Sequence, residues 1–253
     1  MNYIGMKTLI WREIERFTRV AIQSLVSPWI NALLYIFIFG FVVGGRISLI
    51  AGVPYINFVL PGILMLNLIT SAFSQTSFSL YFQRFARHIE ELLVAPFSHI
   101  ELIIAYVIGG LARGVAVGLG IYAIAIFFGA ASVHHPILFL LTVLAVCMIF
   151  SFVGLLVALW SDNFEQLNVL NTFVIMPFTF LGGVFNSITM LPAKMQWVVK
   201  FNPFFYFVDS LRYSMIGVRE GSALVGAVIM VGLMFGLGFW TWILFARGWR
   251  LRS

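Results

Sequence analysis

Charged side chains are scarce in this sequence. Only 9% of its 253 residues are charged, whereas 62% are hydrophobic. A soluble domain carries roughly 25% charged and about 45–50% apolar residues. So few charges cannot cover a soluble fold this rich in apolar side chains, but lipid solvates those side chains directly. The composition excludes an ordinary soluble domain. It predicts one helical membrane domain over residues 1–253, because helices satisfy their own backbone hydrogen bonds in lipid.

Cysteine is almost absent, and the sequence has no phosphate-binding loop. The one cysteine, Cys147, lies in an apolar run, which excludes an internal disulfide and a cysteine-based metal cluster. His134 and His135 have no further ligands beside them, so we expect no metal site. No lysine stands in a Gly-x-x-x-x-Gly-Lys-Ser/Thr sequence. We therefore expect no cofactor in this chain, and ATP, if it drives the protein, must be hydrolysed by another chain.

Long apolar runs, by contrast, are plentiful. A transmembrane helix needs about 20 predominantly apolar residues. Six runs of this kind are predicted to cross the membrane: 27–45, 55–80, 100–128, 136–160, 166–185 and 222–246. Residues 3–23 combine an apolar stripe with basic residues elsewhere around the helix, which predicts an amphipathic helix lying at the lipid interface. The alternative is an amphipathic start that binds no partner.

Lysine and arginine are distributed unequally around these spans. With the amino terminus inside, one side receives Lys7, Arg12, Arg16, Arg19, Arg84, Arg87, Arg247, Arg250 and Arg252, and the other receives Arg46, Lys194, Lys200, Arg212 and Arg219. The excess of positive charge predicts that both termini are cytoplasmic. Basic residues at helix ends are typical of such orientation signals and not of a phosphate-binding stripe. The net charge of +6 therefore does not indicate a nucleic-acid partner. The charged amino-terminal residues also lack the apolar run of a cleavable signal peptide, so we expect the spans themselves to hold the protein in the membrane.

Residues 186–221 are too polar to cross the bilayer and too aromatic for a free loop. Proline disfavours helix at the residue before it, so the pair Asn202-Pro203 predicts two short helices split at this point. We expect this hairpin to dip into one leaflet, with its open backbone packed against protein. Asp209 and Arg212, three residues apart, are expected to form an ion pair within it.

The connection between the second and third predicted spans is longer than a minimal turn. Apolar residues recur at helical spacing at Phe85, Ile89, Leu92 and Leu93, and charged residues occupy the other face, until Pro96 ends the pattern. This pattern predicts a short amphipathic helix over residues 84–96. It is either a surface helix with no partner or a docking element for a soluble protein.

Polar residues in the second and fifth predicted spans are candidates for a substrate path. They are Asn67, Ser71, Ser74, Gln75, Asn171 and Thr172, with Phe178 close by in the sequence. Polar groups at membrane depth need partners and tend to face a bundle interior or a cavity. Two interpretations are equally good: these residues line a path for an amphiphilic substrate, or they form ordinary hydrogen bonds between helices.

Arg113 is the only charge deep inside a predicted span. Such a charge costs at least about 2.5–3.5 kcal/mol on insertion scales. We favour a structural or interfacial role, with contact to an anionic substrate or lipid head group as the alternative. An intramembrane lipid-modifying enzyme would need several ionisable residues at one depth, and a passive channel would need charged pore rings. Neither pattern is present, so we expect a transport subunit that is not itself an enzyme.

Several short motifs, in this order, resemble the ABC-2 type exporter permeases, in particular the YadH-type inner-membrane permeases of Gram-negative bacteria. The motifs are His88-Ile89-Glu90-Glu91-Leu92-Leu93-Val94-Ala95-Pro96, the segments 172–177 and 181–185, Leu191-Pro192, and Asn202-Pro203 with Tyr206, Arg212 and Tyr213. The resemblance covers essentially the whole chain. It implies an all-α fold of the type V exporter kind: six transmembrane helices, an amino-terminal interfacial helix, a cytoplasmic coupling helix and an extracytoplasmic re-entrant hairpin.

The resemblance also implies partners. Two copies of the chain would pair in the bacterial inner membrane, with membrane lipids around them, and two ABC ATPase subunits carrying ATP and Mg²⁺ would dock underneath. The segment from His88 to Pro96 resembles the coupling helix that enters the ATPase. The amino-terminal helix, with Arg12 and Arg16, resembles a second element that touches it. The path would run between the two copies along spans two and five, and a drug, lipid or glycan would leave the cytoplasm through it.

Overall fold

The computed structural model describes residues 3–45 and 49–251, and for Phe41 and Leu93 it describes only the backbone. Arg46 and Arg252, which contribute to the charge asymmetry, lie outside the described residues. The described part is mostly helical, which confirms the predicted all-α class.

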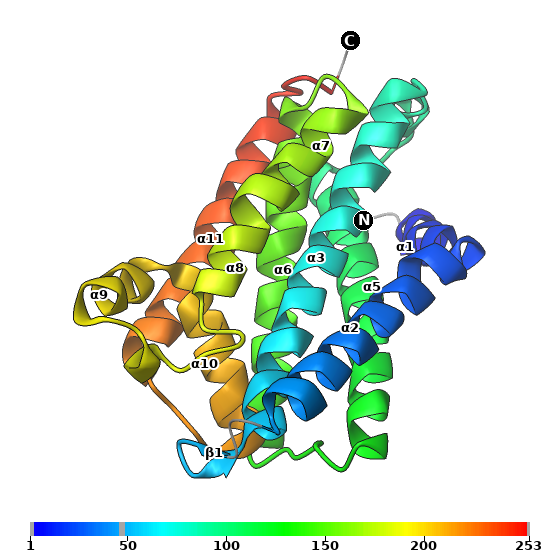
Figure 1. Cartoon of the computed structure of the whole chain (residues 1–253). Helices are drawn as coiled ribbons and strands as arrows, with labels where there is room; N and C mark the ends of the chain where they lie inside the picture. The colour runs from blue at the N-terminus through cyan, green and yellow to red at the C-terminus, as the bar shows by residue number, and fades with distance from the viewer. Residues whose placement is uncertain (1–2, 46–48, 252–253) are drawn as a thin grey trace.

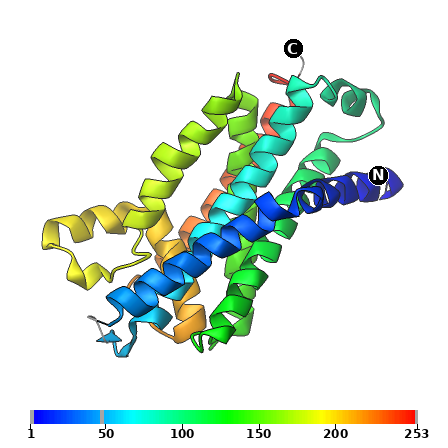
Figure 2. The same cartoon turned by 45° about the vertical axis from the view of Figure 1, so that its right-hand side comes forward.

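Four long helices make up most of the bundle. They are α3 (Tyr55–Phe85), α5 (His99–Phe127), α6 (Pro136–Trp160) and α11 (Ala223–Ala246). An amino-terminal arm crosses them: α1 (Tyr3–Arg19) continues through a π-helical stretch (Ile22–Val26) into α2 (Ser27–Phe37) and a second π-helical stretch (Ile38–Val43). Figure 1 shows α2 crossing in front of the bundle with α1 at its right-hand side, and Figure 2 shows the arm as one long diagonal. A small antiparallel hairpin of β1 (Leu49–Ile50) and β2 (Val53–Pro54) then leads into α3.

Among the described residues, five helical segments are long and apolar enough to cross a membrane: Ile22–Gly40, Tyr55–Phe85, His99–Phe127, Pro136–Trp160 and Ala223–Ala246. The predicted span 166–185 is not one of them. The helix there consists of α7 (Phe164–Leu170), a π-helical stretch (Asn171–Ile175) and α8 (Met176–Leu181). Pro177 has no N–H for the preceding turn, and the wider π turn before it accommodates this missing donor.

The hairpin region follows α8. A short 3₁₀ turn (Ile188–Met190) leads to α9 (Ala193–Phe201) and α10 (Pro203–Ile216). Asn202 separates the two helices, and its side-chain oxygen accepts a hydrogen bond from the Phe204 N–H at the start of α10. In Figure 1, α9 projects sideways from the bundle and α10 runs on toward the end that carries β1, which we call the β1 end. The opposite end, where α3 stops and α5 starts, is called the α4 end, after the short helix α4 (Ile89–Val94) that lies there.

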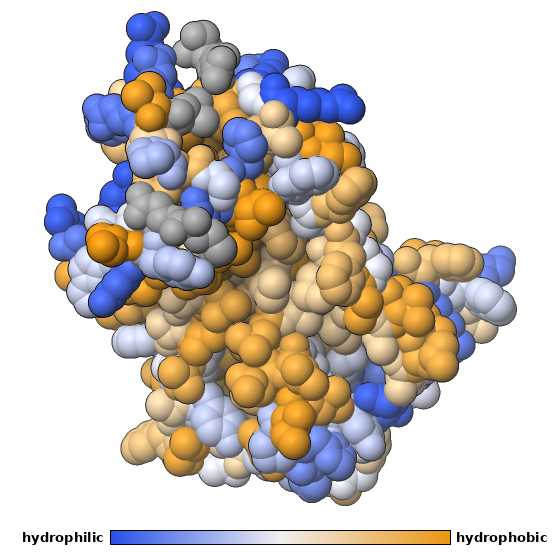
Figure 3. Space-filling view, turned by 180° about the vertical axis from the view of Figure 1, so that it is seen from behind, coloured by the Kyte–Doolittle hydropathy of each residue, from blue (hydrophilic) through white to orange (hydrophobic). Residues whose placement is uncertain are grey.

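The core of the bundle is centred on α3. In its most apolar 18-residue window 83% of the residues are buried, against 11% in α11 and 17% in the segment Ile22–Gly40. Glycines allow the neighbouring helices to approach closely: a Cβ at Gly154 of α6 would lie 2.1 Å from Thr76 Oγ1, and one at Gly110 of α5 would lie 2.3 Å from Ser151 Oγ. The face in Figure 3 shows apolar residues across the middle of the molecule and hydrophilic residues concentrated toward its ends, as a lipid-embedded bundle requires.

The predicted helix 84–96 is shorter in the structure. Residues 84 and 85 belong to the end of α3, and α4 covers only Ile89–Val94. Arg87 separates the two helices because it adopts a positive φ of 58°, which a continuous right-handed helix cannot contain. Phe85 is 66% exposed at the end of α3, so including it in the apolar stripe of this helix was wrong.

Candidate functional site

α4 presents an acidic face at one end of the bundle. Ile89 and Leu92 are 3% and 8% exposed and belong to the main apolar core, whereas Glu90 and Glu91 are exposed on the other side of the helix. Val94, also in this segment, is 88% exposed. The short helix is therefore attached through one face and free to contact another molecule through the other.

The chain around α4 is held by local structure. His88 is exposed just before the helix, Ala95 after it has extended backbone, and Pro96 cannot continue a helix. Ser98 then starts α5 with a capping box, in which the Ser98 hydroxyl accepts from the Glu101 N–H and the Glu101 carboxylate accepts from the Ser98 N–H. The side chain of Leu93, a member of the predicted docking set, lies outside what the structure describes.

A buried carboxylate attaches α1 to the core. Glu13 has no exposed surface, and it accepts hydrogen bonds from Ser79 Oγ at 2.5 Å and Gln83 Nε2 at 3.2 Å, both on α3. The Glu13 backbone carbonyl accepts a further hydrogen bond from Gln75 Nε2 at 3.2 Å. On the α5 side, a Cβ at Gly109 would lie 2.8 Å from the Glu13 Cβ, so only glycine allows α1 to lie this close.

Arg12 and Arg16 take part in the same polar cluster. Arg12 Nη2 donates to Gln83 Oε1 at 3.2 Å and lies 3.7 Å from Glu13 Oε1, and the Tyr106 hydroxyl of α5 donates to that Gln83 oxygen at 2.7 Å. Arg16 Nη1 donates to the carbonyl and hydroxyl oxygens of Ser79, at 3.1 and 3.0 Å. The two arginines predicted to contact an ATPase thus also hold α1 against α3, while the Arg12 side chain keeps 40% of its surface exposed.

The candidate path residues of α3 divide into two groups. Asn67 and Ser71 are 7% and 3% exposed, and Asn67 Nδ2 donates to a carbonyl of its own helix, that of Ile63, at 2.9 Å. Gln75 is 4% exposed and holds α1, as described above. These side chains face the interior of one chain, and of the hydrogen bonds described for them only that of Gln75 joins two helices. Ser74 is half-buried and borders a cavity.

The candidates on the broken helix lie at the surface of the single chain. Thr172 and Phe178 are exposed, and Asn171 is half-buried in the π-helical stretch. Asn171 Oδ1 is buried and has no hydrogen-bond partner among the described residues. The structure therefore does not bring the seven candidates into one pocket: those on α3 point mostly inward, and those on α7 and α8 mostly outward.

A cavity of about 420 Å³ lies between α1, the π-helical stretch after it, α3 and α5. Its charged lining residues are Arg16 and Arg113. The rest of the lining is polar and uncharged (Gln23, Ser24, Ser74, Gln75 and Ser79) or apolar and aromatic, including Phe78, Phe82 and Phe164. Arg113, the isolated charge of the third predicted span, thus faces a cavity rather than a buried carboxylate.

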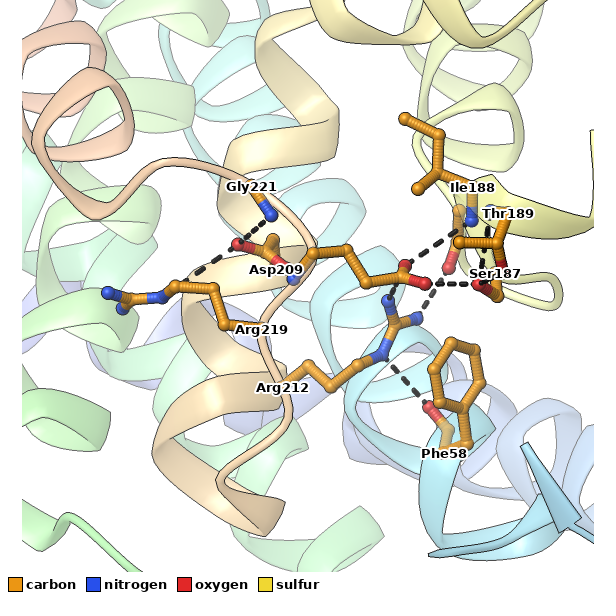
Figure 4. Close-up of polar contacts among 10 residues, drawn as sticks. Phe58, Ser187, Ile188, Thr189, Asp209, Arg212, Arg219 and Gly221 are labelled. Carbon is orange, nitrogen blue, oxygen red and sulfur yellow. Dashed lines mark hydrogen bonds and ion pairs between the residues drawn. The ribbon is translucent and has the colours of Figure 1, made fainter. Parts of the chain in front are cut away.

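A second charged cluster fixes the hairpin near the β1 end (Figure 4). Arg212 is fully buried; its Nη2 donates to the Gly183 carbonyl at 2.5 Å, its Nε donates to the Phe58 carbonyl at 3.3 Å, and its Nη1 lies 3.5 Å from Glu220 Oε2. The guanidinium carbon also lies 3.8 Å from the centre of the Phe58 ring. One side chain therefore joins α10 to α3, to the turn after α8 and to the segment before α11.

The predicted Asp209–Arg212 ion pair is wrong. Arg212 pairs with Glu220 instead, and Asp209 accepts hydrogen bonds from the backbone N–H groups of Glu220 at 2.7 Å and Gly221 at 3.2 Å. Arg219 Nε completes this half of the cluster, 4.0 Å from Asp209 Oδ2. The paired residues are eight and ten positions apart in the sequence, rather than the three that were expected.

Comparison with known proteins supplies the family. A family model for the ABC-2 type transporter matches residues 5–216. The chain belongs to the ABC-2 type transporter family. This ABC-2 chain is 37% identical over 253 residues to the inner membrane transport permease YadH of Escherichia coli K12, with 100% of this chain and 99% of the relative covered. It is also 26% identical over 215 residues to nodulation protein J of Rhizobium meliloti, with 82% of this chain and 80% of the relative covered. The predicted family is confirmed, and the chain is a multi-pass membrane permease of the ABC transporter class.

The residues that attach α1 in this ABC-2 permease were missing from the sequence analysis. Glu13, Ser79, Gln83 and Tyr106 form its centre. One signal was available: Glu13 stands four residues from Leu9 and four from Phe17, both buried, and so lies on the apolar face of an amphipathic helix. An acid on that face requires a polar partner on the helix it packs against.

Proposed function

We propose that this permease is the transmembrane subunit of an ATP-driven exporter in a bacterial inner membrane. Two copies pair, and two ABC ATPase subunits, which carry the ATP and Mg²⁺, dock at the α4 end from the cytoplasm. The broken helix α7–α8 acts as a sixth crossing element, α9 and α10 as the re-entrant hairpin on the outer side, and both termini are cytoplasmic. The cargo is a hydrophobic or amphiphilic molecule such as a drug, lipid or glycan.

The observation that carries this proposal is the two-faced environment of α4. Ile89 and Leu92 are buried in the core while Glu90 and Glu91 are exposed, and short connections join α4 to the end of α3 and the start of α5, so a force on the acidic face would be passed to both helices. A rigid short helix of this kind suits a helix-in-groove contact with a soluble partner. The membership of the ABC-2 family supports an ATPase as that partner.

Arg12 and Arg16 give the proposed docking a second element. Both side chains are partly exposed on α1, and both are bonded to α3 through Gln83 or Ser79. Displacement of α1 by an ATPase would therefore act on α3. Thr172 and Phe178 are exposed on the broken helix, so they could line a path that a second copy completes.

Charge reversal on α4 tests the docking proposal. The chain is co-expressed with candidate ATPases, and the complex is purified in detergent. The double variant Glu90→Lys, Glu91→Lys is expected to weaken co-purification about tenfold or more and to reduce the ATP turnover of the complex in parallel, because like charges across an interface oppose association. The matched control is Glu165→Lys, an exposed acid at the start of α7, which should leave both unchanged.

Two outcomes would contradict the proposal. If no ATPase co-purifies with the unaltered chain, the chain is not half of such a transporter. If an ATPase does bind and the α4 double variant keeps its affinity and turnover, α4 is not the coupling element.

A further inference from the structure

The cavity beside α1 is lined by a half-buried cation, Arg113, for which the described residues supply no ion pair or hydrogen bond. Arg113 Nε is buried and has no hydrogen-bond partner among the described residues. Arg16, across the same cavity, is bonded to Ser79, and Arg12, whose Nε is also without a described partner, donates through Nη2 to Gln83. An unpaired buried guanidinium is costly unless an anion or water neutralises it.

The lining of the cavity favours an anion. Two arginines border it, and its lining residues in the described structure include no acidic side chain. The neighbouring carboxylate, that of Glu13, is already bonded to Ser79 and Gln83. Ser74 and Gln23 add polar groups to the lining for which no side-chain hydrogen bond is described. Arginine is the side chain that suits phosphate oxygens best, because its fork of N–H donors matches their geometry.

The depth of the cavity matches the head groups of a lipid leaflet. An amphipathic helix such as α1 lies at the boundary between head groups and acyl chains. α1 meets α5 at Gly109, where the backbone approaches Glu13, and Arg113 is one helical turn further along α5, about 6 Å away. Arg113 therefore stands about one turn deeper than α1, a depth from which a long arginine side chain, tilted toward the start of α5, can reach the level of the lipid phosphates on the side where α1 lies.

The other lining residues suit the acyl part of the same molecule. Phe78 and Phe82 are 38% and 48% exposed on α3, and Phe164 of α7 is 39% exposed. They border the same cavity as Arg16 and Arg113 and offer apolar surface next to the two cations, with the centre of the Phe82 ring 6.0 Å from the Arg16 guanidinium carbon. We propose that this cavity binds the phosphate group of an anionic phospholipid between Arg113 and Arg16, with its acyl chains along the aromatic residues of α3.

Native mass spectrometry of the delipidated, full-length chain in detergent tests this site. Phosphatidylglycerol is titrated, with diacylglycerol as a lipid without phosphate and glycerol 3-phosphate as a phosphate without acyl chains. The unaltered chain is expected to retain phosphatidylglycerol. Arg113→Gln should weaken that binding about tenfold, as for the loss of one charge-assisted hydrogen bond. Arg113→Lys should bind phosphatidylglycerol with an affinity between those of the unaltered chain and Arg113→Gln, because lysine keeps the charge but not the forked N–H donors.

The matched control is Arg247→Gln, which removes one positive charge from an exposed position after α11, away from the cavity. It should bind phosphatidylglycerol like the unaltered chain, and diacylglycerol should not distinguish any of the variants. The proposal is overturned if Arg113→Gln, with gel-filtration and tryptophan fluorescence profiles of the unaltered chain, keeps its affinity, or if Arg247→Gln loses as much. Binding of glycerol 3-phosphate as tight as that of phosphatidylglycerol would assign the site to a free phosphate and also overturn it. None of these outcomes depends on an ATPase, so the test is independent of the proposed function.

Discussion

Replacing Arg212 by methionine should strongly destabilise this permease. Methionine has a similar length and fills the apolar part of the site, but it removes every polar contact of the guanidinium. The Gly183 and Phe58 carbonyls each lose a donor, and the Glu220 carboxylate, whose side chain is only 8% exposed, loses its cation. The contact with the Phe58 ring is lost as well.

The size of the effect follows from the carboxylate left behind. Removing one partner of a buried ion pair costs about 3–5 kcal/mol of unfolding free energy, mainly because the other charge stays buried and unpaired. Ser187 Oγ and the Ile188 N–H still donate to Glu220, which places the expected loss near the lower figure, about 3 kcal/mol. Adding Glu220→Met should recover part of this loss, because the second change removes the unpaired charge.

The assay is reversible unfolding in mixed micelles with increasing sodium dodecyl sulfate, followed by tryptophan fluorescence. Lys194→Met is the control, because Lys194 is an exposed cation of the same hairpin, and it should change stability by less than about 0.5 kcal/mol. The reasoning fails if the free energy of unfolding of Arg212→Met is within about 1 kcal/mol of that of the unaltered chain. It also fails if the double variant loses the full sum of the two single losses, since the residues would then not be coupled.

Two further changes test the attachment of α1 and the packing of α3. Glu13→Ala should increase the rate of tryptic cleavage within α1 about tenfold or more, because it removes buried, charge-assisted hydrogen bonds to α3. Glu15→Ala should not, because the Glu15 side chain is 43% exposed and its ion pair is with Arg19 of α1 itself. Equal rates in the two variants would contradict the anchoring role. Gly154→Ala should reduce the yield of folded protein in fluorescence-detected gel filtration, because its Cβ would lie 2.1 Å from Thr76 Oγ1 and 2.6 Å from a backbone oxygen. Gly232→Ala, where nothing lies within 4 Å, should leave the profile unchanged, and a similar loss in both would refute the packing argument.

Properties set by composition and by neighbouring residues were predictable. Scarce charge and long apolar runs sufficed to predict an all-α membrane protein, because solvation by lipid depends on what the side chains are and not on where they meet. The split of the hairpin at Asn202-Pro203 was also predictable, since proline acts on the backbone directly before it. The order of motifs along the chain was enough to predict the ABC-2 family.

Contacts between distant residues were decided only by the tertiary structure. Arg212 stands three residues from Asp209, yet it reaches Phe58 and Gly183, because the packing of α10 against α3 buries it beside those carbonyls. Glu13 looked like one charge among several on an interfacial helix, and its role depends on Gly109 allowing α1 to lie against the core. The sequence by itself determined which segments are apolar helices and where prolines divide them. Which charges are paired, and which cation is left facing a cavity, depends on how the helices pack, because an ion pair is defined by distance in space and not by spacing along the chain.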